Sequence, residues 1–309
     1  MALKDVCLPK NFAWESELAD AYHYTNANGE MRTVIHYQIP LPSNKQNVFM
    51  ARYNVAGTEM RGFYQNLVHC IQQEVSVSKH LTGHNVASIL SFSAMEQSRD
   101  DKGVSHIYLE TEQIWPLLDK VLVDPTPSIT VLDVIYRLSV VLRDISKDPV
   151  YVVHRGLDLN EVFINRKNRI KVGGFYYASY PGSYSYPDYL PNRPSNLPIA
   201  FLNGEIGHQG LDLMSLALVA WNLLSGNAHD AKLDNSRWVF PRYATEDLVD
   251  AIKIGISGNE ETCHIFRRRL QECRKRLSKT DFSAQFIPIH KQALKDISVE
   301  YVVIPDTPD

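Results

Sequence analysis

The sequence predicts an α+β protein whose first third is rich in strands and whose remainder is mainly helical. Two β-rich runs, 22–25 and 32–39, flank the turn-forming segment 26–29 (Asn-Ala-Asn-Gly), which is typical of a hairpin. Apolar residues then recur at helical spacing over 59–79, and a stronger apolar stripe runs over 129–145. Strands gathered early and helices gathered late indicate the α+β class.

The other elements of the strand-rich part follow from apolar runs and turn signals. Residues 48–54 are predicted to form a third strand before the helix. The helix is expected to break over 81–86, where Gly, His and Asn follow one another. Two further apolar runs, 87–94 and 104–109, predict a second hairpin with a charged tip at 97–102.

Short strands interrupt the helical part of the chain. We expect them at 150–154, 162–165 and 169–172, with an Asn-Arg-Lys-Asn turn between the last two. Tyr, Ser, Pro, Gly and Asn dominate 175–198, which is typical of a long ordered loop. A strongly apolar helix is predicted over 210–224 and must lie in the core.

Composition favours a folded, soluble, cytoplasmic protein. The 309 residues are 44% hydrophobic and 22% charged, which allows one large domain or two lobes with a sizeable core. A net charge of −3 gives no overall preference for nucleic acid or anionic membrane. No apolar run reaches the length of a membrane span. The cysteines lack paired spacing, so we expect reduced thiols rather than disulfides or a zinc site. They are Cys7, Cys70, Cys263 and Cys273.

Three motifs in order resemble those of protein kinases. The segment 154–164 reads H-R-G-L-D-L-N-E-V-F-I and is similar to the catalytic loop H-R-D-L-x-x-x-N with its following strand. Segment 170–176 resembles the strand that enters the Asp-Phe-Gly motif, with Gly174 eighteen residues after Gly156 (174 − 156). Residues 211–216 resemble the start of the large helix whose Asp holds the catalytic loop.

The resemblance covers roughly residues 20–290 and implies a two-lobed protein-kinase-like fold. A β-rich N-lobe of about five strands and a helix is expected over 1–110, and a mainly helical C-lobe over 111–295. Residues 296–309 are expected to form a C-terminal strand or tail, with β-rich residues at 299–303.

The departures from the family pattern remove its chemistry. In kinases an Asp in the catalytic loop accepts the substrate proton, while an Asn and the Asp of Asp-Phe-Gly hold magnesium. This chain has Gly156, Glu161 and Gly174 at those three positions. The strand Lys position aligns with Arg52 and its helix partner with Glu74. That ion pair could form, but a guanidinium does not reproduce an ammonium's contact with phosphate.

The resemblance therefore implies a pseudokinase, a catalytically degraded member that acts as a protein-binding scaffold or allosteric regulator, with an active protein kinase as one candidate partner. The hairpin expected to cover a nucleotide offers only Gly29, so any ATP binding should be weak and independent of metal. We expect no metal or other cofactor and no phosphate transfer. Restoring Gly174→Asp should leave partner binding nearly unchanged.

The rival hypothesis is an atypical phosphotransferase or nucleotide-binding protein of low activity. Asp158 takes the place of a phosphate-directed Lys, and Glu161 that of the metal-binding Asn, so two carboxylates could hold a metal in one cleft. The simpler interpretation is that both are solvated carboxylates of an open groove.

Several matching residues are assigned structural roles. His154 and Arg155 brace the loop and activation segment in the family, Phe175 matches the middle of Asp-Phe-Gly, and Asp212 is expected to be a buried anchor for the catalytic-loop backbone. Pro198 resembles the family's Ala-Pro-Glu position, but Ile199 replaces its Glu.

The loop tyrosines and a basic helical stretch each allow two interpretations. Tyrosines of the loop either form an interface or pack that loop on the C-lobe: Tyr176, Tyr177, Tyr180, Tyr184, Tyr186 and Tyr189. An amphipathic stretch at 263–279 leaves a basic face that is either solvated or docks an acidic partner, phospholipid or RNA. Its basic residues are Arg267, Arg268, Arg269, Arg274, Lys275 and Arg276.

Overall fold

The structure is a computed structural model, and it describes the parts of the chain that form regular elements and their closest connections. The described residues are 10–13, 19–39, 60–117, 131–179, 208–225, 239–241, 246–256, 263–277 and 301–303. Within them the protein is α+β, as the sequence predicts. None of the described helices combines the length and the apolar run needed to cross a membrane.

A five-stranded antiparallel sheet occupies the N-terminal part, in the order β1-β2-β3-β5-β4. Its strands are β1 (Lys10–Ala13), β2 (Ala19–Thr25), β3 (Met31–Ile39), β4 (Phe92–Arg99) and β5 (Ser105–Glu112). The predicted β2–β3 hairpin is confirmed, because Asn26 closes its turn through backbone bonds with Glu30 and Gly29. Gly29 supplies the positive φ of 79° that this turn requires.

Two expectations for this sheet need correction. β1 was not predicted, so the sheet gains a strand before the hairpin, while the predicted strand at 48–54 lies outside the described residues. The run 87–94 becomes a strand only from Phe92, because Ser88 takes a φ of 66° and breaks the extended backbone. Ile89 instead forms an isolated parallel bridge with Val172.

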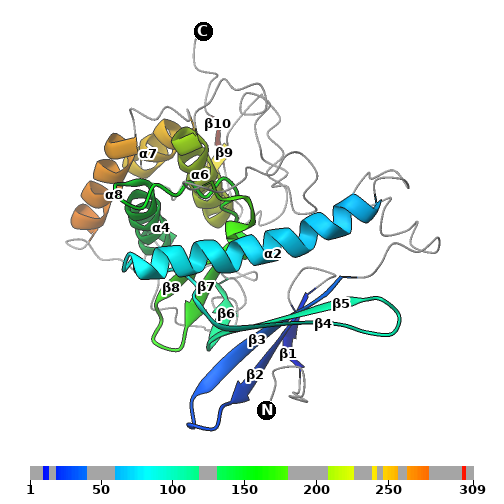
Figure 1. Cartoon of the computed structure of the whole chain (residues 1–309). Helices are drawn as coiled ribbons and strands as arrows, with labels where there is room; N and C mark the ends of the chain where they lie inside the picture. The colour runs from blue at the N-terminus through cyan, green and yellow to red at the C-terminus, as the bar shows by residue number, and fades with distance from the viewer. Residues whose placement is uncertain are drawn as a thin grey trace.

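Helix α2 (Met60–Gly83) packs against the sheet. Its buried Ile71 and Val75 join Ile35, Ile107 and Leu109 in one apolar cluster. The helix continues beyond the predicted range because the full burial of Leu81 stabilises one more turn. It ends at Gly83, where the Val86 amide donates to the Leu81 carbonyl at 3.0 Å. In Figure 1, α2 crosses the molecule between the sheet and the helical group.

A smaller sheet, in the order β6-β7-β8, lies under the helical part. It consists of β6 (Ile114–Pro116), β7 (Val162–Asn165) and β8 (Ile170–Val172). β7 and β8 match the prediction, whereas β6 was missed. The predicted strand at 150–154 is wrong: Tyr151 and Arg155 adopt φ values of 51° and 63°, so only Val153 forms a bridge, with Ser179.

Four helices form the rest of the described core (Figure 1). They are α4 (Val131–Ser146), α6 (His208–Ser225), α7 (Glu246–Ile256) and α8 (Cys263–Leu277). α6 buries most of its length in the apolar core, as expected of a helix with few polar residues. β9 (Val239–Pro241) pairs with β10 (Tyr301–Val303), so the C-terminal strand of the prediction exists.

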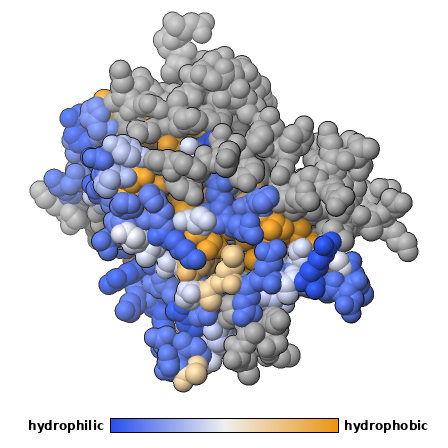
Figure 2. All heavy atoms as spheres, viewed as in Figure 1, coloured by the Kyte–Doolittle hydropathy of each residue, from blue (hydrophilic) through white to orange (hydrophobic). Residues whose placement is uncertain are grey.

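The described surface of the face in Figure 2 is mainly hydrophilic, with apolar residues gathered in a band along the line of α2. Buried apolar residues form two clusters, one under the five-stranded sheet and one among the helices. Phe163 of β7 belongs to the first and its neighbours Val162 and Ile164 to the second. The small sheet thus joins the two clusters, and two of the three segments that resemble kinase motifs, 154–164 and 170–176, include residues of its strands β7 and β8.

Candidate functional site

Asp212, in the first turns of α6, holds the loop that precedes β7. It is 4% exposed, and its Oδ2 accepts the backbone N–H of His154 at 2.8 Å while its Oδ1 accepts that of Arg155 at 2.7 Å. These bonds fix Arg155 in its left-handed conformation, with a φ of 63°. Burial raises the pKa of Asp212 to about 7, although both amide bonds oppose the shift.

His154 ties the same loop to the end of β8. Its Nδ1 accepts the Gly156 amide at 3.3 Å, so its Nε2–H donates to the Gly173 carbonyl at 2.9 Å. Burial lowers the pKa of His154 to about 4, which keeps the ring neutral and suits this tautomer. The ring also packs on Phe175, with 4.5 Å between ring centroids. His154 is thus a buried structural link between two loops.

Gly156 and Gly174 are the residues whose positions resemble those of a kinase's base and one of its metal ligands. Both are buried and neither has a functional side chain. Gly174 has a φ of 75°, and a Cβ built on it would lie 2.4 Å from Cγ of Glu161. No real Cβ tolerates that approach. The Glu161 side chain therefore fills the space that a side chain at position 174 would need.

Glu74 of α2 reaches the same place from a different element. Its Oε1 accepts the backbone N–H of Gly174 at 2.9 Å. Burial raises the pKa of Glu74 and that of Glu161 above the ordinary range, and the charge of Glu74 adds to the shift of Glu161. Among the described residues, the second oxygen of each carboxyl is buried without a hydrogen-bond partner. Burial thus favours the protonated form of both carboxyls.

Two tyrosines complete the cluster, and sequence reasoning did not find their role. Tyr37 of β3 and Tyr176 of the 3-10 turn η3 (Phe175–Tyr177) place their hydroxyls 3.0 Å apart. Burial raises the pKa of Tyr37 well above its ordinary value, and the charge of Glu74 adds to this shift. The alternation of β3 indicates that Tyr37 faces inward, but no sequence signal pairs it with a residue so far along the chain. Among the loop tyrosines, Tyr176 thus packs inward.

Arg52, the expected partner of Glu74, lies outside the described residues. The Arg52–Glu74 ion pair therefore stays a prediction. Gly29, expected in a hairpin over a nucleotide, is at an open turn where an added Cβ would meet no atom within 4 Å. The structure thus brings Glu74, Glu161 and Gly174 together and leaves Gly29 in the solvent-facing β2–β3 turn.

The pair Asp158 and Glu161 is close enough to interact, because the charge of Asp158 contributes to the raised pKa of Glu161. The interpretation of both as solvated carboxylates is wrong for Glu161, which is 8% exposed, while Asp158 is half-buried. Glu161 turns inward because Gly174 leaves it room. Within the described ranges no three His, Cys, Asp or Glu side chains are placed to hold a metal together.

The described basic residues of α8 differ in their surroundings. Arg268 and Arg269 are exposed and lie 3.9 and 3.8 Å from the Glu272 carboxylate, and Lys275 is exposed as well. Arg267 is half-buried and lines a pocket, so it is separate from this face. The side chains of Arg274 and Arg276 lie outside the described part.

Comparison with known proteins gives no family assignment: no protein-family model matches the chain, and no curated protein matches it.

Proposed function

We propose that this chain is a pseudokinase, a two-lobed kinase-like protein that binds other proteins and does not transfer phosphate. Its described elements support the proposal through their order, a strand-rich unit with one long helix followed by a mainly helical unit. The segments that resemble the catalytic loop and the Asp-Phe-Gly strand adjoin in space through His154 and Gly173. The Asp of the helix at 208–225 holds the catalytic-loop backbone at His154 and Arg155.

The observation that carries the proposal is the mutual fit of Glu161 and Gly174. A metal-binding Asp at position 174 is incompatible with the present course of the Glu161 side chain, since their atoms would overlap. The Glu161 side chain therefore fills the site, and burial favours the protonated form of Glu161 and Glu74. Protonated carboxyls lack the negative charge with which carboxylates bind magnesium.

Rate arithmetic agrees with this interpretation. A positioned general base contributes about 10²–10⁴-fold, and metal stabilisation of charge contributes several kcal/mol more. Kinases turn over at about 1–100 s⁻¹. Loss of both contributions lowers turnover by about 10⁴-fold or more if they add, to about one turnover in minutes or slower.

Transfer of radiolabelled phosphate with magnesium or manganese tests the absence of catalysis. We expect no autophosphorylation and no transfer to generic protein substrates. Activity above background that disappears in Asp158→Asn or Glu161→Gln, and persists in the exposed-site control Glu30→Gln, would overturn the proposal in favour of the atypical phosphotransferase. The closeness of Asp158 and Glu161 favours that second candidate, whereas the burial of Glu161 opposes it.

The binding role needs a test of its own. We propose a scaffold or allosteric regulator, with an active protein kinase as the candidate partner. Affinity capture from the native cell, followed by reconstitution with the purified candidate kinase, should show that stoichiometric addition of this chain changes that kinase's rate. A captured kinase whose rate and substrate choice are the same with and without the chain would contradict the regulatory role.

A further inference from the structure

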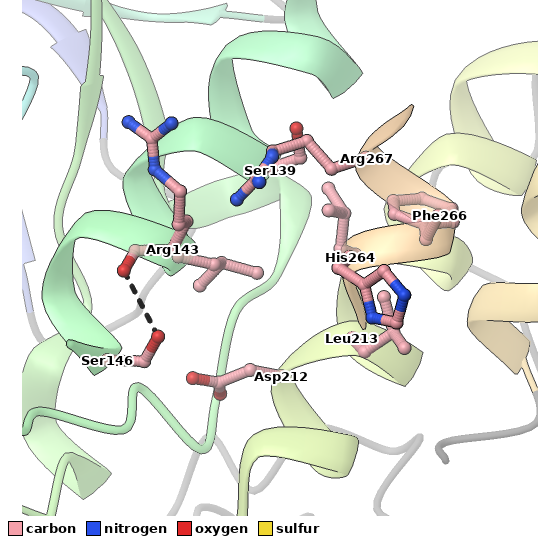
Figure 3. Close-up of a pocket in the computed structure, with 10 residues that line it drawn as sticks. Ser139, Arg143, Ser146, Asp212, Leu213, His264, Phe266 and Arg267 are labelled. Carbon is pink, nitrogen blue, oxygen red and sulfur yellow. Dashed lines mark hydrogen bonds between the residues drawn. The ribbon is translucent and has the colours of Figure 1, made fainter. Parts of the chain in front are cut away.

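A pocket opens between α4, α6 and α8, away from the carboxyl cluster at Glu74 and Glu161. Its volume is about 180 Å³. The apolar part of its lining comes from Leu142, Leu213, Leu216 and Phe266. Figure 3 shows Arg143 and Arg267 toward one end of this space, His264 and Phe266 along one side, and Asp212 at the other end.

The size of the pocket sets the size of its ligand. An apolar cavity of about 150 Å³ in another protein accepts benzene. The present pocket is slightly larger and is walled by leucines and one phenylalanine. It therefore has room for one aromatic ring with a short substituent. A long acyl chain would not fit inside it.

The charged groups around the pocket favour an anion. Within the described residues Arg267 has no ion-pair partner, and His264 is exposed. Arg143 contacts the Asp144 carboxylate at 2.6 Å, but Lys147 shares that carboxylate at 3.1 Å, so two cations face one acid. The oxygens of Asp212 already accept two backbone amides. A ligand carboxylate can thus gain a guanidinium without displacing a buried ion pair.

The two pocket hydroxyls define a further requirement. Ser139 donates its proton to the Tyr136 carbonyl at 2.6 Å, and Ser146 donates to the Arg143 carbonyl at 3.1 Å. Both oxygens can then only accept a hydrogen bond. They suit a ligand that carries a donor such as a hydroxyl group, while the anionic end of the ligand must turn to the arginines.

We propose that this pocket binds a small aromatic carboxylate, with its ring between the leucines and Phe266 and its carboxylate on Arg267 and Arg143. A ring hydroxyl at the opposite end would donate to Ser146, which lies nearer Asp212 in Figure 3. This site is independent of the pseudokinase proposal, because none of its ring or carboxylate contacts uses the carboxyl cluster. Asp212 borders the pocket and holds His154 and Arg155, so an occupied pocket adjoins the support of the catalytic-like loop.

The probe is 4-hydroxyphenylacetate, titrated into the full chain by calorimetry. We expect saturable binding with a Kd of about 1 mM or tighter, and at least about tenfold weaker binding of the neutral methyl ester, since an arginine contact with the carboxylate is lost. Arg267→Gln should weaken binding of the acid about tenfold and leave the ester unaffected. Arg268→Gln on the same helix, outside the pocket, is the matched control and should bind as the parent does.

Methyl spectra of leucine-labelled protein locate the bound probe. The methyl signals of Leu142, Leu213 and Leu216 should shift with the same saturation curve as the calorimetric signal. Equal affinity for acid and ester, equal loss in Arg267→Gln and Arg268→Gln, or shifts confined to leucines outside the pocket would each overturn the proposal. Absence of saturable binding by the acid would overturn it as well.

Discussion

The hydroxyls of Tyr37 and Tyr176 lie 3.0 Å apart although 139 positions separate these residues in the chain. The contact joins β3 of the five-stranded sheet to the turn after β8, directly beside Glu74. It therefore links the sheet to the segment that resembles the Asp-Phe-Gly motif. A partly buried contact between parts so distant in sequence is a point at which the sheet and this turn depend on each other.

A double-mutant cycle should detect this dependence. Tyr37→Phe should lower the free energy of unfolding by about 0.5–1.5 kcal/mol, because it removes one net hydrogen bond. Tyr176→Phe should cost at least as much, because its hydroxyl also bonds to Glu74. The double variant should lose less than the sum, since the second change removes a bond already broken. Urea denaturation at pH 7 measures all three variants, and strictly additive losses would show that the hydroxyls are not coupled.

Gly174→Asp should destabilise the protein strongly, a consequence that the sequence-based expectation about partner binding did not address. The new Cβ would overlap Glu161 in a backbone with a φ of 75°, and a third carboxyl would enter the site. We expect a loss of about 3 kcal/mol or more in the free energy of unfolding, from steric overlap together with left-handed strain.

The variant Gly29→Asp separates the effect of steric overlap from that of left-handed backbone strain. Gly29 has a φ of 79° but no atom within 4 Å of an added Cβ, so only the backbone strain applies there. Its loss should be no more than about 1–2 kcal/mol. Glu161→Ala in the Gly174→Asp background should recover part of the stability. Equal melting temperatures for the two glycine variants would show that Glu161 does not occupy the space above Gly174.

Asp212→Ala should cost about 1–3 kcal/mol of unfolding free energy, because the amides of His154 and Arg155 lose their acceptor inside the protein. Asp212→Asn keeps one acceptor and should cost less. The exposed Asp250, whose side chain is 67% exposed, gives the control Asp250→Ala, for which we expect a change within about 0.5 kcal/mol. A melting temperature for Asp212→Ala equal to that of the control would contradict the anchoring role.

Stability should fall as the pH rises from 5 to 8, through the buried carboxyls. Burial raises the pKa of Asp212 to about 7 and raises those of Glu74 and Glu161, so the folded state holds protons that the unfolded chain has released. Their contribution is complete below the unfolded pKa of about 4 and is lost as the pH passes the folded values. His154 acts oppositely, since its pKa is lowered to about 4 and its contribution is lost on acidification.

The variant Glu161→Gln tests how much Glu161 contributes to this pH dependence of stability. The amide cannot ionise, so the variant should gain stability relative to the parent at pH 8 and much less at pH 5. Glu30→Gln, at an exposed turn position, should follow the parent at both values. Melting curves over this pH range provide the measurement, and a Glu161→Gln curve parallel to the parent's would indicate that Glu161 titrates as an ordinary exposed carboxyl.

ATP should raise the melting temperature little, and to the same degree with and without magnesium. The site that resembles the metal-binding position holds a glycine and a buried Glu161, so no described group replaces the lost ligand. A thermal shift reports binding through the stabilisation that a ligand confers on the folded state. A large shift that requires magnesium and disappears in Glu161→Gln would contradict this and would assign a metal to that carboxylate.

The sequence by itself determined the class of the fold and most of its local elements. Helical periodicity placed α2 and α4, and the turn at 26–29 placed the first hairpin, because side-chain spacing and turn conformation are local properties. It also identified Gly156, Glu161 and Gly174 as departures from a familiar pattern. The strand expected at 150–154 failed because Tyr151 and Arg155 take positive φ values, and that of Arg155 depends on Asp212, far along the chain.

Only the tertiary structure decided how Glu161 and Gly174 pack against each other and against Glu74. The inward turn of Glu161 depends on the absence of a side chain at Gly174 and on Glu74 from another element. The contact between Tyr37 and Tyr176 and the pocket between α4, α6 and α8 likewise require elements distant in sequence. Periodicity reports which side of an element is apolar, whereas the partner facing that side is set by how all the elements pack at once.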